Sequence, residues 1–161
     1  RILEAHRVRS RHFKEPTRQI LTNHNDMLYT GTMLLGGEQI EGILDTGSFE
    51  LVVFGAKCDT CGTAVAYNNK KSCCYQNGKF VKFLAYGSGS CYTEDAFDDV
   101  AIAGLTAHGQ AFWEATQCAM SLLLHAEFNA IVGLGPPGEP VYEAQVWLAN
   151  VQQQLISAVG P

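Results

Sequence analysis

Short apolar stretches separated by glycine-containing turns run through most of this 161-residue chain. Residues 29–35 and 39–44 flank Gly36-Gly37, which is the pattern of a β-hairpin. Residues 80–86 and 91–97 flank a second glycine-rich turn and alternate between apolar and polar side chains. Runs of this length are too short for helices and have the spacing of strands. The sequence therefore predicts a mostly β domain.

The remaining segments extend this pattern and end it near the C-terminus. Further strands are expected at residues 51–54, 109–118 and 130–134, and another hairpin at 100–107 that turns at Gly104. An edge strand is expected near 18–21 and a polar, cysteine-rich loop at 58–78. Beyond Pro140 the spacing of apolar residues changes from that of strands to that of a helix, at Val141, Ala144, Leu148, Val151 and Leu155. One α-helix is expected there.

Charge divides the chain into a basic arm and an acidic body. Residues 1–18 hold six basic and two acidic side chains, which leaves five of the 11 Lys and Arg and 14 of the 16 Asp and Glu for the rest. We expect an arm at 1–25 and a folded domain at 26–161. The acidic body would repel phosphates, so nucleic acid is not an expected partner. No apolar run reaches the length of a transmembrane helix.

The residues best suited to chemistry are Asp45-Thr46-Gly47-Ser48, which lie between two buried strands. Gly47 allows a tight turn and lets its N–H approach the carboxylate of Asp45. The hydroxyls of Thr46 and Ser48 are short donors, and such donors tune the ionisation of a carboxylate. A plain turn between two strands explains the same tripeptide, so its context has to decide.

Three further motifs supply that context: Tyr29-Thr30-Gly31-Thr32 upstream, Tyr86-Gly87-Ser88-Gly89 downstream, and Ile131-Val132-Gly133 beyond both. In order and spacing the four motifs resemble the N-terminal lobe of the pepsin-like aspartic proteases, over residues 29–156. The resemblance implies one lobe of the pepsin-like acid protease β-barrel fold, with the expected C-terminal helix in the family's position.

The resemblance also assigns roles to the Asp45 motif. It implies that Asp45 is a catalytic carboxylate, that Thr46 grips its counterpart across the lobe interface, and that Ser48 hydrogen-bonds Asp45. Gly47 would face the substrate. In this family two close carboxyl groups share a proton and activate a water molecule, so no metal or cofactor is expected.

A flap over the substrate is the second implied element. Tyr86, Gly87 and Ser88 match it, and they are expected to contact a polypeptide substrate. Val52 stands where the family usually has a tryptophan that hydrogen-bonds the flap tyrosine. Phe49-Glu50 replaces a small polar pair.

The chain carries a single D-T-G motif, and Asn129 replaces a common aspartate. The carboxylates of Asp26, Asp59, Asp95, Asp98 and Asp99 are expected at loops or hairpin edges. A second lobe would have to come from a C-terminal half, a separate chain or self-dimerisation. The alternative is an inactive lobe that serves as a structural or interaction subunit of a larger complex, which the 1–25 arm contacts.

An even number of cysteines, six in all, favours disulfides and an oxidising compartment, such as the secretory pathway, a vacuole or another organelle lumen. They are Cys58, Cys61, Cys73, Cys74, Cys91 and Cys118. The resemblance implies a small Cys58–Cys61 disulfide loop. Cys91 is expected to pair with Cys73 or Cys74, which leaves Cys118 buried or paired with the remaining thiol. Zinc on the first four cysteines is the rival, disfavoured because adjacent cysteines are poor chelators.

Overall fold

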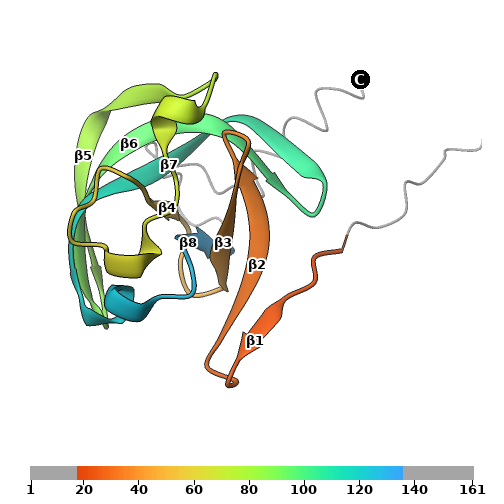
Figure 1. The fold of residues 1–161 in the computed structure, drawn as a ribbon, viewed down its shortest axis with the longest axis vertical. Helices are drawn as coiled ribbons and strands as arrows, with labels where there is room; N and C mark the ends of the chain where they lie inside the picture. Colours follow the sequence, from red (N-terminus) through yellow and green to blue (C-terminus); the bar gives the residue numbers. More distant parts are fainter. Residues whose placement is uncertain (1–17, 136–161) are drawn as a thin grey trace, which may run out of the picture.

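The computed structural model describes residues 18–135 and confirms a mostly β fold. Its eight strands belong to one sheet, in the order β1-β2-β3-β8-β4-β7-β6-β5 (Figure 1). The strands are β1 (Thr22–His24), β2 (Leu28–Leu35), β3 (Glu38–Asp45), β4 (Leu51–Phe54), β5 (Gln76–Tyr86), β6 (Gly89–Ile102), β7 (Leu105–Met120) and β8 (Ala130–Gly133). Three 3-10 turns lie in the connections: η1 (Gly62–Ala64), η2 (Asn69–Lys71) and η3 (Ser121–His125).

The sheet curls because β2 also pairs with β6, in a register that sets Met33 opposite Ile102 and Leu35 opposite Val100. Two clusters of buried side chains fill the curved sheet. One surrounds Met33, Leu35 and Phe112, and the other surrounds Phe54 and Trp113 together with four of the cysteines. The two clusters give the short strands the apolar faces that they need for stability.

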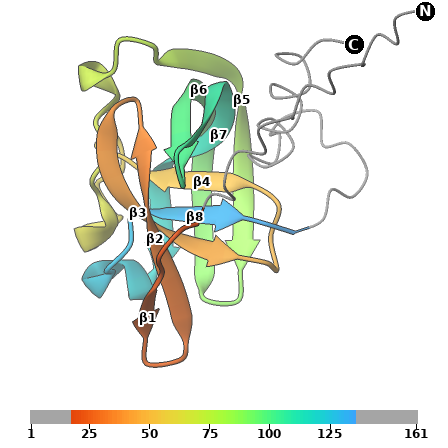
Figure 2. The same ribbon diagram turned by 90° about the vertical axis from the view of Figure 1, so that its right-hand side faces the viewer.

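The strand β8 lies between β3 and β4, although those two strands are neighbours in sequence (Figure 2). It pairs in parallel with β3, where Gly133 lies opposite Asp45, and antiparallel with β4, where Val132 lies opposite Leu51. The loop that joins β3 to β4 therefore crosses over the end of β8. This crossing places the Asp45 motif on top of three paired strands.

Glycine is required at position 133 because the chain passes so close to this loop. A Cβ atom there would lie 2.4 Å from the backbone nitrogen of Glu50 and 2.4 Å from the carbonyl carbon of Phe49. The crossing is fastened by three backbone hydrogen bonds: Gly133 N to Glu50 O at 3.0 Å, Leu134 N to Asp45 O at 2.7 Å, and Gly135 N to Ser48 O at 2.8 Å.

The hairpins are longer than the sequence pattern predicts. β6 and β7 run unbroken through the segments expected as separate strands, and bulges bend them at Tyr92–Thr93 and Asp98–Val100. Gly109 has a φ of 58°, which glycine tolerates, and so it does not end β7. The edge strand forms at Thr22–His24 rather than near 18–21. The helix expected beyond Pro140 lies outside the described residues.

Candidate functional site

The carboxylate of Asp45 stands at the end of β3, where the chain leaves the sheet. Its Oδ1 accepts a hydrogen bond from the backbone N–H of Gly47 at 2.9 Å, as the glycine in the motif predicts. Its carbonyl oxygen accepts the N–H of Leu134. The side chain is only partly buried. The carboxylate is thus held on one side by the loop and is open to solvent on the other.

The two hydroxyls of the motif differ in their surroundings. Thr46 is exposed. Ser48 Oγ is buried and has no hydrogen-bond partner among the described residues, so the expected bond to Asp45 is not formed. Ser48 is held through its backbone instead, because its carbonyl accepts the N–H of Gly135. Buried hydroxyls without a partner are uncommon in folded proteins.

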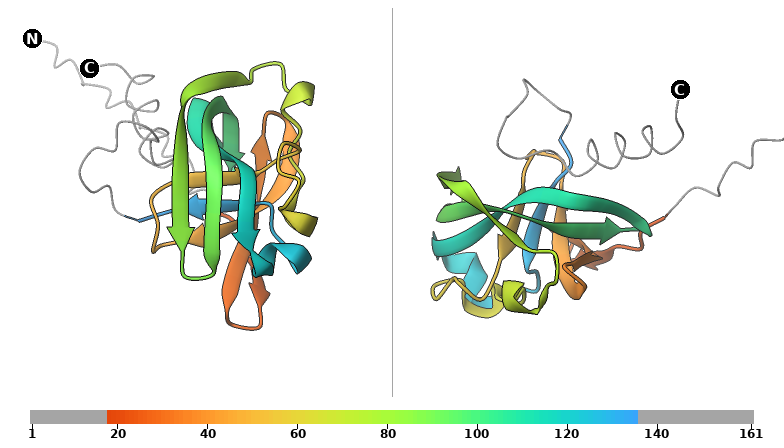
Figure 3. Two further views of the ribbon diagram at one scale, coloured as in Figure 1. Left: turned by 90° about the vertical axis from the view of Figure 1, so that its left-hand side faces the viewer. Right: turned by 90° about the horizontal axis from the view of Figure 1, so that it is seen from above.

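Tyr86 ends β5, and the exposed Gly87 and Ser88 form the tip of the β5–β6 hairpin. This long hairpin is prominent in the left view of Figure 3. Burial and the neighbouring charges of Glu50 and Asp45 raise the pKa of Tyr86 to about 12. The phenol of the hairpin is therefore within electrostatic range of the carboxylates of Glu50 and Asp45.

Residues 28–159 match the family model described as eukaryotic aspartyl protease. The chain belongs to this family. Cathepsin E of Cavia porcellus is 36% identical to it, over 73% of this chain and 31% of that protein. Pregnancy-associated glycoprotein 2 of Sus scrofa is 32% identical, over 90% and 36%. Pepsin A of Suncus murinus is 31% identical, over 86% and 38%. The chain thus spans about a third of the length of the curated relatives it matches.

An ion pair connects the two motifs of this aspartyl protease chain. Lys82 on β5 pairs with Glu50, the last residue of the loop between β3 and β4, and both side chains are mostly buried. Its Nζ also lies over the indole of Trp113, 5.2 Å from the ring centroid. A cation over an aromatic face is attracted by the ring quadrupole. The middle of β5 is therefore tied to the loop that follows Asp45.

The sequence pattern missed Trp113, which is fully buried and lies opposite Val52 in the β4–β7 pairing. Its Nε1 has no hydrogen-bond partner among the described residues. The tryptophan missing from position 52 thus has a counterpart on the next strand. The signal available in the sequence was an aromatic pair, Phe112-Trp113, in a predicted strand, but only the register shows which residue it faces.

Two carboxylates expected at loops or hairpin edges are buried on β6, which corrects that prediction. Asp98 is 0% exposed and accepts hydrogen bonds from the hydroxyls of Tyr67 at 2.7 Å and Ser72 at 2.9 Å. Asp95 accepts the backbone N–H of Phe80 at 2.7 Å. These bonds offset the cost of burying a charge. Both carboxylates brace the fold and contact neither Asp45 nor Tyr86 in any described interaction.

A third buried carboxylate has a cation beside it. Glu114 is 1% exposed, and its Oε2 lies 3.1 Å from Lys57 Nζ and accepts a 2.8 Å hydrogen bond from the hydroxyl of Tyr75. Burial opposes the charge of Lys57, but the hydrogen bonds with Tyr75 and Glu114 outweigh it and raise the pKa of Lys57. The contacts of Glu114 with Lys57 and Tyr75 anchor the loop before β5 to β7.

Asn129, which replaces a common aspartate of the family, joins two segments of the fold by side-chain hydrogen bonds. Its Oδ1 accepts the N–H of Glu41 at 3.1 Å, and its Nδ2 donates to the carbonyl of Ala64 at 3.1 Å. An ionised aspartate can accept the first bond but cannot donate the second. The amide therefore suits this position, where it joins β3 to η1.

The cysteines form two disulfides and one open pair. Cys58 and Cys61 are bonded to each other, which confirms the pairing that the resemblance implied. Cys91 is bonded to Cys118 rather than to Cys73 or Cys74. The reason is register, because Cys91 and Cys118 lie directly opposite each other on β6 and β7.

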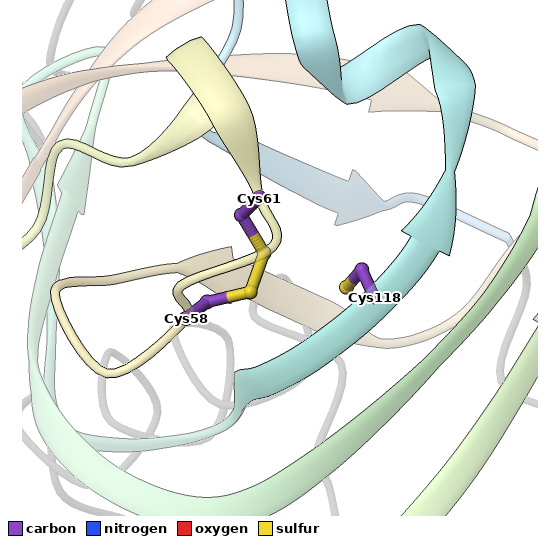
Figure 4. Close-up of side chains that lie close together, drawn as sticks. All are labelled: Cys58, Cys61 and Cys118. Carbon is purple, nitrogen blue, oxygen red and sulfur yellow. A yellow bond between two sulfur atoms is a disulfide. The ribbon is translucent and has the colours of Figure 1, made fainter.

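The sulfur atoms of Cys58, Cys61 and Cys118 lie within 4.8 Å of one another and are buried (Figure 4). A thiolate is the form that binds zinc, and all three sulfurs are already held in disulfides. The close approach is the packing of two disulfides. The zinc hypothesis named Cys58 and Cys61 as well, and their bond removes both of those ligands.

Proposed function

We propose that this chain supplies one lobe of an aspartic endopeptidase, with Asp45 as one of two catalytic carboxyl groups. The observation that carries the proposal is the carboxylate of Asp45, which the N–H of Gly47 holds at the end of β3 on a loop that the Tyr86 hairpin reaches through the Lys82–Glu50 ion pair. Family membership adds the expectation of a polypeptide substrate. Gly47 would face that substrate, and Tyr86, Gly87 and Ser88 would lie over it.

The proposed reaction needs a second carboxyl group close to Asp45. Two carboxyl groups at short distance cannot both ionise easily, so one stays protonated and hydrogen-bonds the scissile carbonyl. The ionised one takes a proton from a water molecule, which attacks the carbonyl carbon. Thr46 is exposed and would bind the loop that brings the second carboxyl group. The reaction requires no metal or cofactor.

We propose that residues 26–161 form this lobe and that the second one comes from a C-terminal half, a separate chain or a second copy. The basic arm at 1–25 would lie over the acidic body or anchor it to a larger partner. Two disulfides support an oxidising compartment. In the described residues no helix is long and apolar enough to cross a membrane.

A second candidate is a lobe that no longer catalyses and acts as a subunit of a larger complex. The observation that favours it is Ser48 Oγ, which does not hold the carboxylate of Asp45. A lobe of this kind would use its open face as an interface with the partner that covers it.

Cleavage of an unfolded protein at acidic pH separates the two functions. The protein is tested as the full gene product, with any second lobe present, and with a statine-type inhibitor. Asp45→Asn should lower the cleavage rate at least about 100-fold, since a positioned acid–base group contributes that much. The matched control is Asp59→Asn, which changes an exposed loop aspartate and should leave the rate unchanged.

Inhibitor-sensitive cleavage that needs Asp45 would exclude the inactive subunit. Full gene product that cleaves nothing, or cleaves equally well after Asp45→Asn, would instead exclude the endopeptidase. Circular dichroism of both variants is recorded first, so that loss of folding is not taken for loss of chemistry.

A further inference from the structure

Two adjacent thiols, Cys73 and Cys74, remain after the other four cysteines have paired. Both are exposed, and their Sγ atoms lie 2.7 Å apart. They come immediately before β5, the first strand of the Tyr86 hairpin. Within this chain each thiol has one available partner, which is the other.

The segment that carries the two thiols is connected to the core by hydrogen bonds. The backbone N–H of Cys74 donates to Ser72 Oγ at 3.1 Å, and Ser72 Oγ donates to Asp98 Oδ1 at 2.9 Å. Asp98 is fully buried and also accepts the hydroxyl of Tyr67. The two sulfur atoms are therefore kept together at the surface by bonds that reach into the core.

We propose that Cys73 and Cys74 are a redox-active pair that closes into a vicinal disulfide at the expense of a small-molecule or protein disulfide. One thiolate attacks the external disulfide, forms a mixed disulfide and releases the first external thiol. The second thiolate then attacks the mixed disulfide and releases the second external thiol. The two cysteines lose two electrons and two protons, and the external disulfide gains them.

The contact between the two thiols also affects their ionisation. The hydrogen bond with Cys73 raises the pKa of Cys74 to about 11, with smaller contributions from burial and from the charges of Asp99 and Asp98. Because the pair is exposed, reductants should open it before they reach the two buried disulfides.

The sequence provides a simple assay. Trypsin cuts after Lys71 and Lys79, so both thiols fall in one peptide, residues 72–79. The folded chain is incubated with a mixture of oxidised and reduced glutathione, quenched with N-ethylmaleimide under denaturing conditions and digested without reductant. We expect this peptide to be lighter than its reduced dithiol form by two hydrogen atoms and to carry neither N-ethylmaleimide nor glutathione.

Three results would overturn the proposal: two N-ethylmaleimide groups on the peptide, a lasting glutathione adduct, or a bond from this peptide to a second copy of the chain. Stepwise reduction tests the order of opening. The 72–79 peptide should gain label while the peptides that hold Cys58, Cys61, Cys91 and Cys118 stay unlabelled. Simultaneous labelling would contradict a separate exposed pair.

Single substitutions supply the control. Cys73→Ser and Cys74→Ser should each trap one glutathione, since the resolving thiol is gone, and the double variant should trap none. All three keep the two buried disulfides and should fold. The proposal does not rest on catalysis, because Asp45→Asn should leave the oxidation of the 72–79 peptide unchanged. An Asp45 variant that alters this oxidation would show that the pair reports on the loop instead.

Discussion

Replacing Gly133 with alanine tests whether the crossing of β8 under the Asp45 loop holds the site together. The added Cβ would lie 2.4 Å from Glu50 N, 2.4 Å from the carbonyl carbon of Phe49 and 2.7 Å from its nitrogen. Ordinary van der Waals contact begins at 3.4 Å. All three neighbours are backbone atoms of one loop, so no side chain can turn aside. The loop and β8 must separate by about 1 Å to reach ordinary contact distance.

The size of the effect follows from what this separation disrupts. The three backbone hydrogen bonds of the crossing join Gly133, Leu134 and Gly135 to the loop. At about 1 kcal/mol each, their loss costs about 3 kcal/mol. Overpacking increases this loss by roughly 1 kcal/mol. Alanine has fewer conformations than glycine in the unfolded chain, which stabilises the folded state by about the same amount. The expected loss is about 3 kcal/mol, or roughly 10 °C in Tm for a domain of this size.

The assay is urea denaturation followed by circular dichroism and tryptophan fluorescence. Gly87→Ala is the matched control, since a Cβ there meets nothing within 4 Å and the hairpin tip is exposed. It should change the free energy of unfolding by less than about 0.5 kcal/mol. A Gly133→Ala chain as stable as the Gly87→Ala chain would refute the crossing as the support of the loop. Failure of Gly133→Ala alone to fold would agree with it.

Four other substitutions test three contacts of the site and of the strands around it. In a double-mutant cycle by urea denaturation, Lys82→Gln and Glu50→Gln should show a coupling energy of about 1 kcal/mol, and additive effects would mean that the ion pair is not formed. Glu38 on β3 forms an ion pair with Lys71, and the hydrogen bond between them lowers the pKa of the Glu38 carboxyl. The stabilisation from this pair is therefore present above pH about 4.3 and is lost as the pH falls through the lowered pKa. Glu38→Gln should therefore be less stable than the original chain at neutral pH and equal to it in strong acid, and a constant difference in thermal melts across this range would contradict the linkage. The amide of Asn129 donates a hydrogen bond to a backbone carbonyl, which an ionised aspartate cannot do. Asn129→Asp should therefore lower the free energy of unfolding by about 1–2 kcal/mol at pH 7 in the same melts. The loss should be smaller in acid, where a protonated carboxyl can donate.

Local patterns predicted the parts of this fold that depend on local chemistry. The hydrogen bond between the N–H of Gly47 and the carboxylate of Asp45 depends only on a glycine two residues after the aspartate, and it forms at 2.9 Å. The β5–β6 hairpin follows from alternation and a glycine-rich turn, and its tip lies where the pattern placed it. The order of motifs along the chain was enough to indicate the family, which the match over residues 28–159 confirms.

Features that depend on register were out of reach of such patterns. The bond between Cys91 and Cys118 requires the two residues to lie opposite each other, and a bulge at Tyr92–Thr93 shifts that pairing beyond simple counting. The burial of Asp98 depends on a tyrosine from a distant loop, whose hydroxyl arrives only once the chain has folded. Polarity alone placed this aspartate at the surface, because the sequence does not show which charges find partners.

The tryptophan beside β4 shows how a substitution read along the chain can mislead. Val52 removes an indole from the position where the family usually has one, and by itself this predicts a weaker support for the Tyr86 hairpin. Trp113 brings an indole to the facing position on β7, with Lys82 of the hairpin over its ring. Lys82 also forms an ion pair with Glu50. The three side chains therefore link β7, β5 and the loop after Asp45, which one side chain alone cannot do. Because Lys82 lies midway along β5, this ion pair and its contact with the indole tie the middle of the hairpin strand to the loop that carries Asp45.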